Sequence, residues 1–486
     1  MTHHSSSRII TVKLPDNTTV SVTTAMQAAM QHHQAGRLRR AQAIYNLVLQ
    51  AAPNNVDALH LLGLVTRQFG NHEIAVGLIN QAIKLNPNVA MFHNNLAETY
   101  RVMDRPDEAI AHCKKALALQ PDFSEAYYNL AMALRMQGKL DEAIACFEQA
   151  IRGKPGFIEA HAGLGETLHK QGRADEALAT YRKALHSYPD NPTLLSSMGI
   201  ALRTLGRVDE AIAHYKKAIA VRPDIPELHN NLGVIYKAQG KLSEAAACFR
   251  QVLELRPNDG SARHLLNALQ QQTTDCAPRG YVQETFDNYA QGFDKHLAGK
   301  LEYRVPEIMG KAIKTFLAHN SQKMDILDLG CGTGLVGVEL REISRRLVGI
   351  DLSPKMIAKA RERGVYDQLV VGDVLDHMTK LEQDTFDLVT SADVFVYIGN
   401  LHPVFEHCRR ILCPGGLFAF SLEALPDENR DFVLAATGRY QQSRAYIGKL
   451  SQHFGFIEVH FTPIHVRKEQ DQPVNGYIYL LRKQAN

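Results

Sequence analysis

A short run of glycines beside an acidic residue is the part of this sequence that most clearly indicates chemistry. The run is Asp328-Leu-Gly330-Cys-Gly332-Thr-Gly334. Glycines let the backbone turn sharply and approach a ligand closely, where any Cβ atom would collide with it. Asp351 follows, and one carboxylate can accept hydrogen bonds from both hydroxyl groups of a ribose. Together these residues predict a binding site for a cofactor that contains a ribose.

The glycine run alone is compatible with two kinds of cofactor. Gly332-Thr-Gly334-Leu-Val-Gly337 fits the GxGxxG pattern of dinucleotide-binding folds. Asp351 also stands close to the position, about twenty residues downstream, at which such folds place a ribose-binding acid. A nicotinamide-dependent oxidoreductase is therefore one hypothesis.

The sequence after residue 280 predicts strands that alternate with helices, as in a doubly wound α/β fold with a mainly parallel sheet. Helices are expected near 335–344, 354–363 and 400–412. Two last strands, near 457–466 and 474–482, leave no room for a crossover helix and should pair antiparallel. The other strands are expected at 324–329, 346–351, 368–372, 386–391 and 416–421.

The order of these features resembles one enzyme family. Asp328 precedes the first glycine, Phe386-Asp-Leu-Val389 and Pro414-Gly-Gly416 follow in order, and a terminal hairpin closes the sheet. This arrangement resembles the Rossmann-like class I S-adenosylmethionine-dependent methyltransferases and differs from a dinucleotide fold built of two βαβαβ halves. The resemblance implies S-adenosyl-L-methionine as cofactor and methyl transfer to an acceptor, a small molecule or a protein, that the sequence does not identify.

The resemblance also implies cofactor-binding residues. According to this resemblance, Asp373 accepts a hydrogen bond from the adenine amino group. Asp328 helps to hold the amino acid end of the cofactor, or else it only braces the glycine turn. Leu352 and Met356 pack on the adenine or belong to the core. The full set of expected cofactor-binding residues is Asp328, Gly330, Gly332, Gly334, Asp351, Leu352, Met356, Asp373, Val374 and Arg304.

Two residues after the fourth strand are candidates for catalysis. Methyl transfer mainly requires that an acceptor be held in line with the methyl carbon in a dry pocket. A hydroxyl, thiol or protonated amine acceptor also needs a base, and Asp393 and Tyr397 are the expected candidates. The segment 281–304 resembles the leading helices of small-molecule methyltransferases, which close over the cofactor. We expect no metal site, because the cysteines and histidines lack metal-ligand spacing.

The first half of the chain repeats itself every 34 residues. Alanine and glycine recur with the same period as proline. The alanines stand where two helices must approach closely, and the glycines stand where the chain turns between helices. This pattern resembles the tetratricopeptide repeat, an all-α superhelix, with seven units over 22–259. The repeated prolines are Pro53, Pro87, Pro121, Pro155, Pro189, Pro223 and Pro257.

The remaining segments complete the expected domain organisation. Alternating apolar residues within 1–21 predict a hairpin that caps the repeats. Residues 260–280 are expected to form a capping helix followed by a linker, and residues 281–486 the methyltransferase domain. A repeat superhelix presents a groove for a protein or peptide, and Asn95, Asn129 and Asn231 form a broken row of amides there. A second hypothesis is therefore a non-catalytic interaction scaffold that retains a cofactor fold.

Composition narrows the setting of the protein. The 486 residues carry a formal net charge of +3, and basic clusters fall among acidic neighbours, so neither nucleic acid nor a membrane is an expected partner. The seven cysteines form no CxxC pair, which favours a reducing compartment. No apolar stretch has the length of a signal peptide core or a membrane span, and we expect a cytoplasmic protein.

Overall fold

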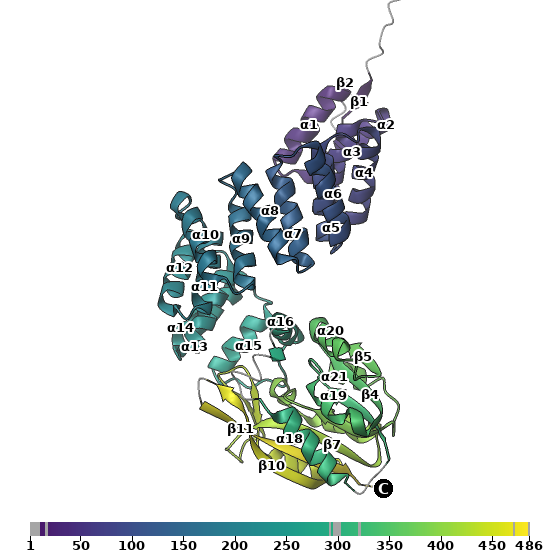
Figure 1. Ribbon diagram of the computed structural model, residues 1–486, viewed down its shortest axis with the longest axis vertical. Helices are drawn as coiled ribbons and strands as arrows, with labels where there is room; N and C mark the ends of the chain where they lie inside the picture. The colour runs from purple at the N-terminus through teal and green to yellow at the C-terminus, as the bar shows by residue number, and fades with distance from the viewer. Residues whose placement is uncertain are drawn as a thin grey trace, which may run out of the picture. The chain divides into compact units, whose positions relative to one another are not determined.

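The computed structural model describes residues 10–14, 18–290, 293–294, 303–318, 322–469 and 472–484. It divides the chain into two compact units, Met1–Asp224 and Ile225–Asn486 (Figure 1). The second unit therefore begins inside the repeats and includes the last helical pair. Among the described residues, no helix combines the length and the apolar character needed to cross a membrane.

Seven helical pairs form the repeats, as the 34-residue period predicts. The alanines that recur in each pair are at most 1% exposed, so they do allow the two helices to approach closely. Where Asp104 replaces the recurrent glycine, it adopts the same left-handed conformation, with φ of 57°. The helices are α1 Val22–Gln34, α2 Leu38–Ala51, α3 Val56–Gln68, α4 His72–Leu85, α5 Ala90–Val102, α6 Pro106–Leu119, α7 Ser124–Met136, α8 Leu140–Gly153, α9 Ile158–Lys170, α10 Ala174–Ser187, α11 Pro192–Thr204, α12 Val208–Val221, α13 Pro226–Ala238 and α14 Leu242–Leu255.

Short elements stand before and after these pairs. Strands β1 (Thr11–Lys13) and β2 (Thr19–Ser21) form the expected antiparallel hairpin, whose turn at 15–17 lies outside the described residues. Val12 of this hairpin is buried in a cluster with residues of α1 and α2. Helix α15 (Gly260–Leu269) follows the seventh pair, as predicted for a capping helix.

One mixed sheet of nine strands forms the frame of the second unit in its described residues. Its main path runs in the order β10-β11-β7-β6-β3-β4-β5. Strands β3 to β7 on this path pair in parallel, whereas β11 is antiparallel to both β7 and β10, as the short terminal connection predicts. The strands are β3 Met324–Leu329, β4 Ser344–Asp351, β5 Gln368–Val371, β6 Phe386–Ser391, β7 Leu412–Ala424, β8 Phe432–Leu434, β9 Tyr440–Gln442, β10 Phe456–Glu469 and β11 Gln472–Lys483.

Helices cover both faces of this sheet. Alternate side chains of β3 point to opposite faces, because the side-chain period of a strand is two. Ile326 packs with α18 and α19, whereas Leu327 packs with α21, α22 and α23. The helices are α16 Arg279–Tyr289, α18 Val305–Phe316, α19 Leu335–Leu340, α20 Pro354–Arg363, α21 Val374–Met378, α22 His402–Ile411 and α23 Arg444–His453.

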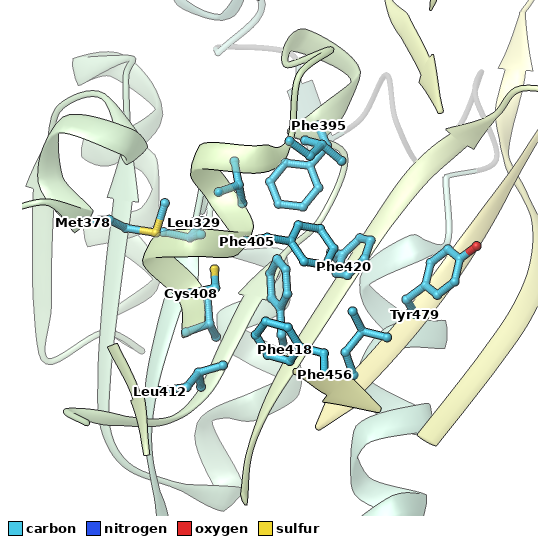
Figure 2. Close-up of a cluster of buried hydrophobic side chains, with 14 of the residues drawn as sticks. Leu329, Met378, Phe395, Phe405, Cys408, Leu412, Phe418, Phe420, Phe456 and Tyr479 are labelled. Atoms are coloured by element: carbon cyan, nitrogen blue, oxygen red, sulfur yellow. The ribbon is translucent and has the colours of Figure 1, made fainter. Parts of the chain in front are cut away.

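Aromatic rings fill the core beneath α22. Figure 2 shows Phe405 of α22 beside Phe418 and Phe420 of β7, with ring centroids 5.5 and 5.8 Å away. Tyr479 of β11 stacks on Phe420 at 5.3 Å, which joins the terminal hairpin to the same core. These packed layers fix the strand ends, and the strand ends carry the site.

Candidate functional site

A pocket of about 380 Å³ lies where the parallel strands β3, β4, β5 and β6 end. Ligands of open α/β sheets bind at this edge, outside the carboxyl ends of the strands. We call it the strand-end pocket. It brings together eight of the residues selected from the sequence: Gly330, Gly332, Asp351, Leu352, Asp373, Val374, Asp393 and Tyr397.

The glycine loop follows β3 directly and has the conformation that its sequence predicts. Gly330, Gly332 and Gly334 have φ of 66°, 53° and 93°, a left-handed region that residues with a Cβ atom rarely adopt. A Cβ atom on Gly330 would also collide with Cγ2 of Val394, which follows β6. The glycines thus let the loop backbone turn tightly at the pocket wall.

Asp351 stands at the end of β4 with its carboxylate fixed by two backbone groups. Gly332 N donates to Oδ2 at 2.9 Å, and Ser353 N donates to Oδ1 at 2.8 Å. Burial raises the pKa of Asp351 to about 6, although these two hydrogen bonds favour the charged form. Each carboxylate oxygen keeps further acceptor capacity, so Asp351 can bind hydroxyl groups without losing the loop.

Asp373, which follows β5, caps one helix and also contacts another, α16. Its Oδ1 accepts from Leu375 N at 3.0 Å and from Asp376 N at 3.1 Å, so it caps α21. Its Oδ2 lies 3.0 Å from Nε of Arg279, at the start of α16. Arg279 therefore stands beside the carboxylate that the sequence assigned to the adenine end of the cofactor.

Helix α16 and Asp294, which follows it, contact the residues after β4 and the glycine loop. Ser353 Oγ donates to Asp287 Oδ1 at 2.5 Å. Thr333 Oγ1, inside the glycine loop, donates to Asp294 Oδ1 at 2.7 Å, and Arg363 also binds Asp294. The aromatic residues Phe286, Tyr289 and Phe293 of this segment all line the pocket.

Asp393, which also lines the pocket, is joined to a buried pair of charges. Its backbone is left-handed, with φ of 58°, an uncommon conformation for a residue other than glycine. Arg467 NH1 lies 3.3 Å from Asp393 Oδ1, and NH2 of the same side chain binds Glu423. Arg467 and Glu423 are both buried, so each charged group has the other as its partner in place of water.

Tyr397 lies in the short helix η2 (Phe395–Tyr397) and faces both α16 and the β8–β9 hairpin. The Phe286 ring packs edge-on against it with centroids 5.5 Å apart. Burial raises its pKa above the usual value, while the guanidinium of Arg439, hydrogen-bonded to its hydroxyl, acts in the opposite direction. Tyr397 is therefore protonated at neutral pH and suited to donate a hydrogen bond.

Four residues named from the sequence do not line the strand-end pocket. Asp328 is buried beneath the loop and accepts from Tyr366 OH at 2.6 Å and Thr390 Oγ1 at 2.9 Å, the bracing arrangement that was the alternative to a cofactor contact. Met356 is fully buried in α20, the core position that was its alternative. Gly334 instead caps α19. Arg304 is 65% exposed and paired with Glu307, so its expected contact with the cofactor has no support in this geometry.

The β8–β9 hairpin, which sequence patterns did not predict, brings Arg439 to the pocket wall. Its turn is held from outside the sheet: His264 Nε2 of α15 lies 2.9 Å from the Gly438 carbonyl oxygen, and Lys237 Nζ of α13 donates to the Thr437 carbonyl at 2.9 Å. Leu434 N donates to Thr273 Oγ1 at 3.2 Å. The last repeat and its capping helix are thus packed onto the pocket-bearing fold.

The residues expected to form a linker are also ordered against the pocket. Gly399 N and Asn400 N donate to the Asp275 carbonyl, and Ala277 N donates to the Tyr397 carbonyl at 2.9 Å. The segment was expected to be a linker, and its backbone groups pair with the loop after β6. Arg467 and Arg439 were missed too. The one signal that the sequence offered for Arg467 was a charged side chain inside a strand, β10.

Family models match both halves of the chain. A methyltransferase domain model matches residues 327–420. Tetratricopeptide repeat models match residues 88–155, 128–192 and 226–259, and a model described as anaphase-promoting complex, cyclosome, subunit 3 matches residues 34–116. The matched ranges agree with the two kinds of structure described above.

Individual relatives cover parts of the chain. A malonyl-[acyl-carrier protein] O-methyltransferase of Geobacter sulfurreducens is 30% identical over 30% of this chain and 53% of its own length. A mitochondrial ubiquinone biosynthesis O-methyltransferase of Rattus norvegicus is 30% identical over 24% of this chain and 36% of its own. The crystal structure of MamA protein is 30% identical over 34% of this chain and 90% of that chain, with a TM-score of 0.31.

The chain spans about half the length, or less, of the curated relatives that it matches. The N-terminal helical pairs have their own family models. This chain is a tetratricopeptide-repeat protein joined to a methyltransferase domain of the class I, Rossmann-like type.

Proposed function

We propose that the second unit transfers a methyl group from S-adenosylmethionine to an acceptor, and that the repeats recruit a protein partner or substrate. The observation that carries the proposal is the strand-end pocket itself. The glycine loop and Asp351 line it, and so do Asp393 and Tyr397. A cofactor and an acceptor can therefore meet inside one cavity.

The residues of the pocket fit this cofactor. Asp351 has acceptor capacity for the two ribose hydroxyl groups, and Leu352 and Val374 offer apolar surfaces for a flat base. Asp373 can accept the adenine amino group on the oxygen that also faces Arg279. The volume of about 380 Å³ is within the usual range for small-molecule sites.

The cofactor supplies a methyl group on a positively charged sulfonium, which needs no covalent intermediate with the protein. The protein's own part is to exclude water and to hold the acceptor. Phe286, Tyr289 and Phe293 support both tasks, because their rings line the pocket and aromatic faces attract a cation. The anchors from Asp287 and Asp294 keep this segment over the loop.

Asp393 is the better candidate for a general base than Tyr397. A phenol whose pKa is raised by burial cannot accept a proton at neutral pH. The Asp393 carboxylate faces the pocket, and the Arg467 guanidinium 3.3 Å away holds it in place. We infer that Asp393 takes the acceptor proton and that Tyr397 donates a hydrogen bond that orients the acceptor.

The acceptor atom is proposed to be oxygen. Several relatives are named as O-methyltransferases, and a carboxylate base in a pocket that also offers Tyr397 and Arg439 suits a hydroxyl or carboxyl acceptor. The acceptor itself can be a small molecule or a group on a protein that the repeats recruit.

The experiment that tests this function incubates the full chain with methyl-labelled S-adenosylmethionine and a host lysate. We expect label to enter protein or small molecules, and to be lost with Asp393→Asn. Label that enters no fraction, while the cofactor still binds, would favour the scaffold hypothesis. Binding of NADH without binding of S-adenosylmethionine would overturn the assignment in favour of an oxidoreductase.

A further inference from the structure

A set of hydrogen bonds ties the turn of the β8–β9 hairpin to the last repeat and the segment after it. Each bond joins a residue of 434–440 to a residue of 237–274, and both ranges belong to the second unit. Arg439 lies among the bonded residues, and its carbonyl accepts from Ala435 N at 2.8 Å, which closes the turn. The bonded pairs are Lys237–Thr437, His264–Gly438, Thr273–Leu434 and Thr274–Tyr440.

The hairpin turn takes a place that belongs to the next repeat elsewhere in the array. Lys237 has the same position in the 34-residue period as Arg67, which reaches Glu98 of the next first helix at 2.6 Å. The position of Glu98 is occupied by Ala268 in α15, the helix that follows the last pair. Ala268 shares a buried cluster with the hairpin, and Lys237 bonds the Thr437 carbonyl instead of a glutamate. The end of the repeats is thus shaped to hold this turn.

The turn presents Arg439 to Tyr397 at the wall of the strand-end pocket, which both residues line. The Arg439 guanidinium is hydrogen-bonded to the Tyr397 hydroxyl, and it also lies 3.7 Å from Glu423 Oε1. A guanidinium has donors and no acceptor, so the Tyr397 oxygen accepts this bond. The O–H of Tyr397 is then left to donate to a different group. Arg439 therefore fixes the role of Tyr397 as a donor.

We propose that Arg439 is a positioning residue for the acceptor that acts through Tyr397, and that Lys237 and His264 hold Arg439 in place. This inference rests on the proposed function, in which Tyr397 donates the hydrogen bond that orients the acceptor. It makes the last repeat part of the acceptor site. Cofactor binding should not depend on the hairpin, because backbone groups of Gly332 and Ser353 hold Asp351.

Carbon NMR of the full chain, labelled at the ζ carbon of tyrosine, reads the Arg439 contact without any acceptor. The ζ carbon bears the hydroxyl, and Tyr397→Phe identifies the Tyr397 resonance by its loss. Arg439→Met removes the guanidinium donors and keeps an apolar stem, so we expect it to shift this resonance. Arg439→Lys keeps a charged donor and should shift it less.

The same resonance tests the role of the last repeat. Lys237→Met removes the donor to the Thr437 carbonyl at a partly exposed position and should also shift the Tyr397 resonance. Lys217→Met is the matched control, because Lys217 Nζ makes an equivalent bond of 2.8 Å to the Pro189 carbonyl in the first unit. Circular dichroism checks that the helices persist in both variants.

A label-transfer assay tests the consequence for the acceptor, with host lysate as its source and methyl-labelled S-adenosylmethionine as donor. Arg439→Met and Tyr397→Phe should each raise the half-saturating amount of lysate about tenfold. Combining them should raise it no further, since the two residues act as one unit. The dissociation constant of S-adenosylmethionine, measured by calorimetry, should stay unchanged in all three variants.

Three results would overturn the positioning role. They are an unshifted Tyr397 resonance in Arg439→Met, equal shifts with Lys237→Met and Lys217→Met, and additive losses when Arg439→Met and Tyr397→Phe are combined. Label that enters no fraction with the unsubstituted chain would instead contradict the proposed function. The resonance shifts do not depend on that result, so the two failures are distinguishable.

Discussion

His264 Nε2 lies 2.9 Å from the carbonyl oxygen of Gly438, and this contact joins a helix that ends the repeats to the turn that carries Arg439. His264 is buried and its ring packs on Tyr281 of α16, with centroids 4.8 Å apart. Burial lowers the pKa of His264, so the ring is neutral and donates one N–H to Gly438. Helix α15 and the turn that carries Arg439 are thus linked by a defined hydrogen bond.

Replacing His264 by alanine should loosen the β8–β9 turn. The Gly438 carbonyl would lose its donor at a buried position, which costs about 1–3 kcal/mol of unfolding free energy. Hydrogen exchange should rise at Gly438, whose N–H donates to Ala435. His161→Ala is the control, since His161 Nε2 makes an equivalent bond of 2.9 Å to the Pro155 carbonyl in the first unit. Equal exchange at Gly438 in both variants would contradict the role of His264.

The position of the domain boundary gives a second prediction. A chain that begins at Ile225 should fold cooperatively, because it keeps α13 to α15. A chain that begins at Tyr281 would expose Leu434 and Tyr440, which are buried against Ala268 and Ala277. Its thermal midpoint should be lower by several degrees, since each exposed large apolar side chain costs about 1.5–3 kcal/mol. Equal thermal midpoints would show that the last repeat is dispensable.

Gly330 offers a test of the cofactor loop. Gly330→Ala adds a Cβ atom at φ of 66° that collides with Val394, so it should both destabilise the loop and abolish S-adenosylmethionine binding. Gly364→Ala is matched in φ, at 67°, but its Cβ would meet nothing within 4 Å. We expect it to cost only about 1 kcal/mol of unfolding free energy and to leave binding intact. Loss of cofactor binding in both variants would contradict a specific role of the Gly330 contact.

The sequence predicted the elements that follow a period. The 34-residue repeat and the alternation of strands with helices arise from local side-chain patterns, and the bounds of β3, β6 and α20 match the expected ranges. Asp351 and Asp393 could also be predicted from the sequence, because parallel strands carry their functional residues at one edge of the sheet.

What the sequence could not provide are contacts between distant segments. The Lys237 contact to Thr437 joins residues 200 positions apart, and the His264 contact to Gly438 joins residues 174 apart. No local pattern signals either one. Arg304 was expected to bind the cofactor, but its guanidinium pairs with Glu307 instead.

Asp393 provides the test of the proposed base. Asparagine tolerates the left-handed backbone at φ of 58° but cannot take a proton, so Asp393→Asn should lower kcat by about 10²–10⁴. Cofactor affinity should change little. Tyr397→Phe should instead raise KM for the acceptor more than it lowers kcat. Radiolabel transfer to the identified acceptor measures both variants, and an Asp393→Asn enzyme with full kcat would exclude Asp393 as the base.

The central claim is that the strand-end pocket binds S-adenosylmethionine through ionised Asp351. Its pKa of about 6 is raised by burial, so its contribution to stability is greatest at low pH and is lost as pH rises through 6, whereas hydroxyl binding gains from ionisation. Calorimetric titration of the full chain from pH 5 to pH 8 measures this directly. We predict saturable binding at pH 8 that weakens about tenfold per pH unit below about 6, with this pH dependence absent in Asp351→Asn. No heat with S-adenosylmethionine at any pH, or an unchanged pH dependence in Asp351→Asn, would contradict the account.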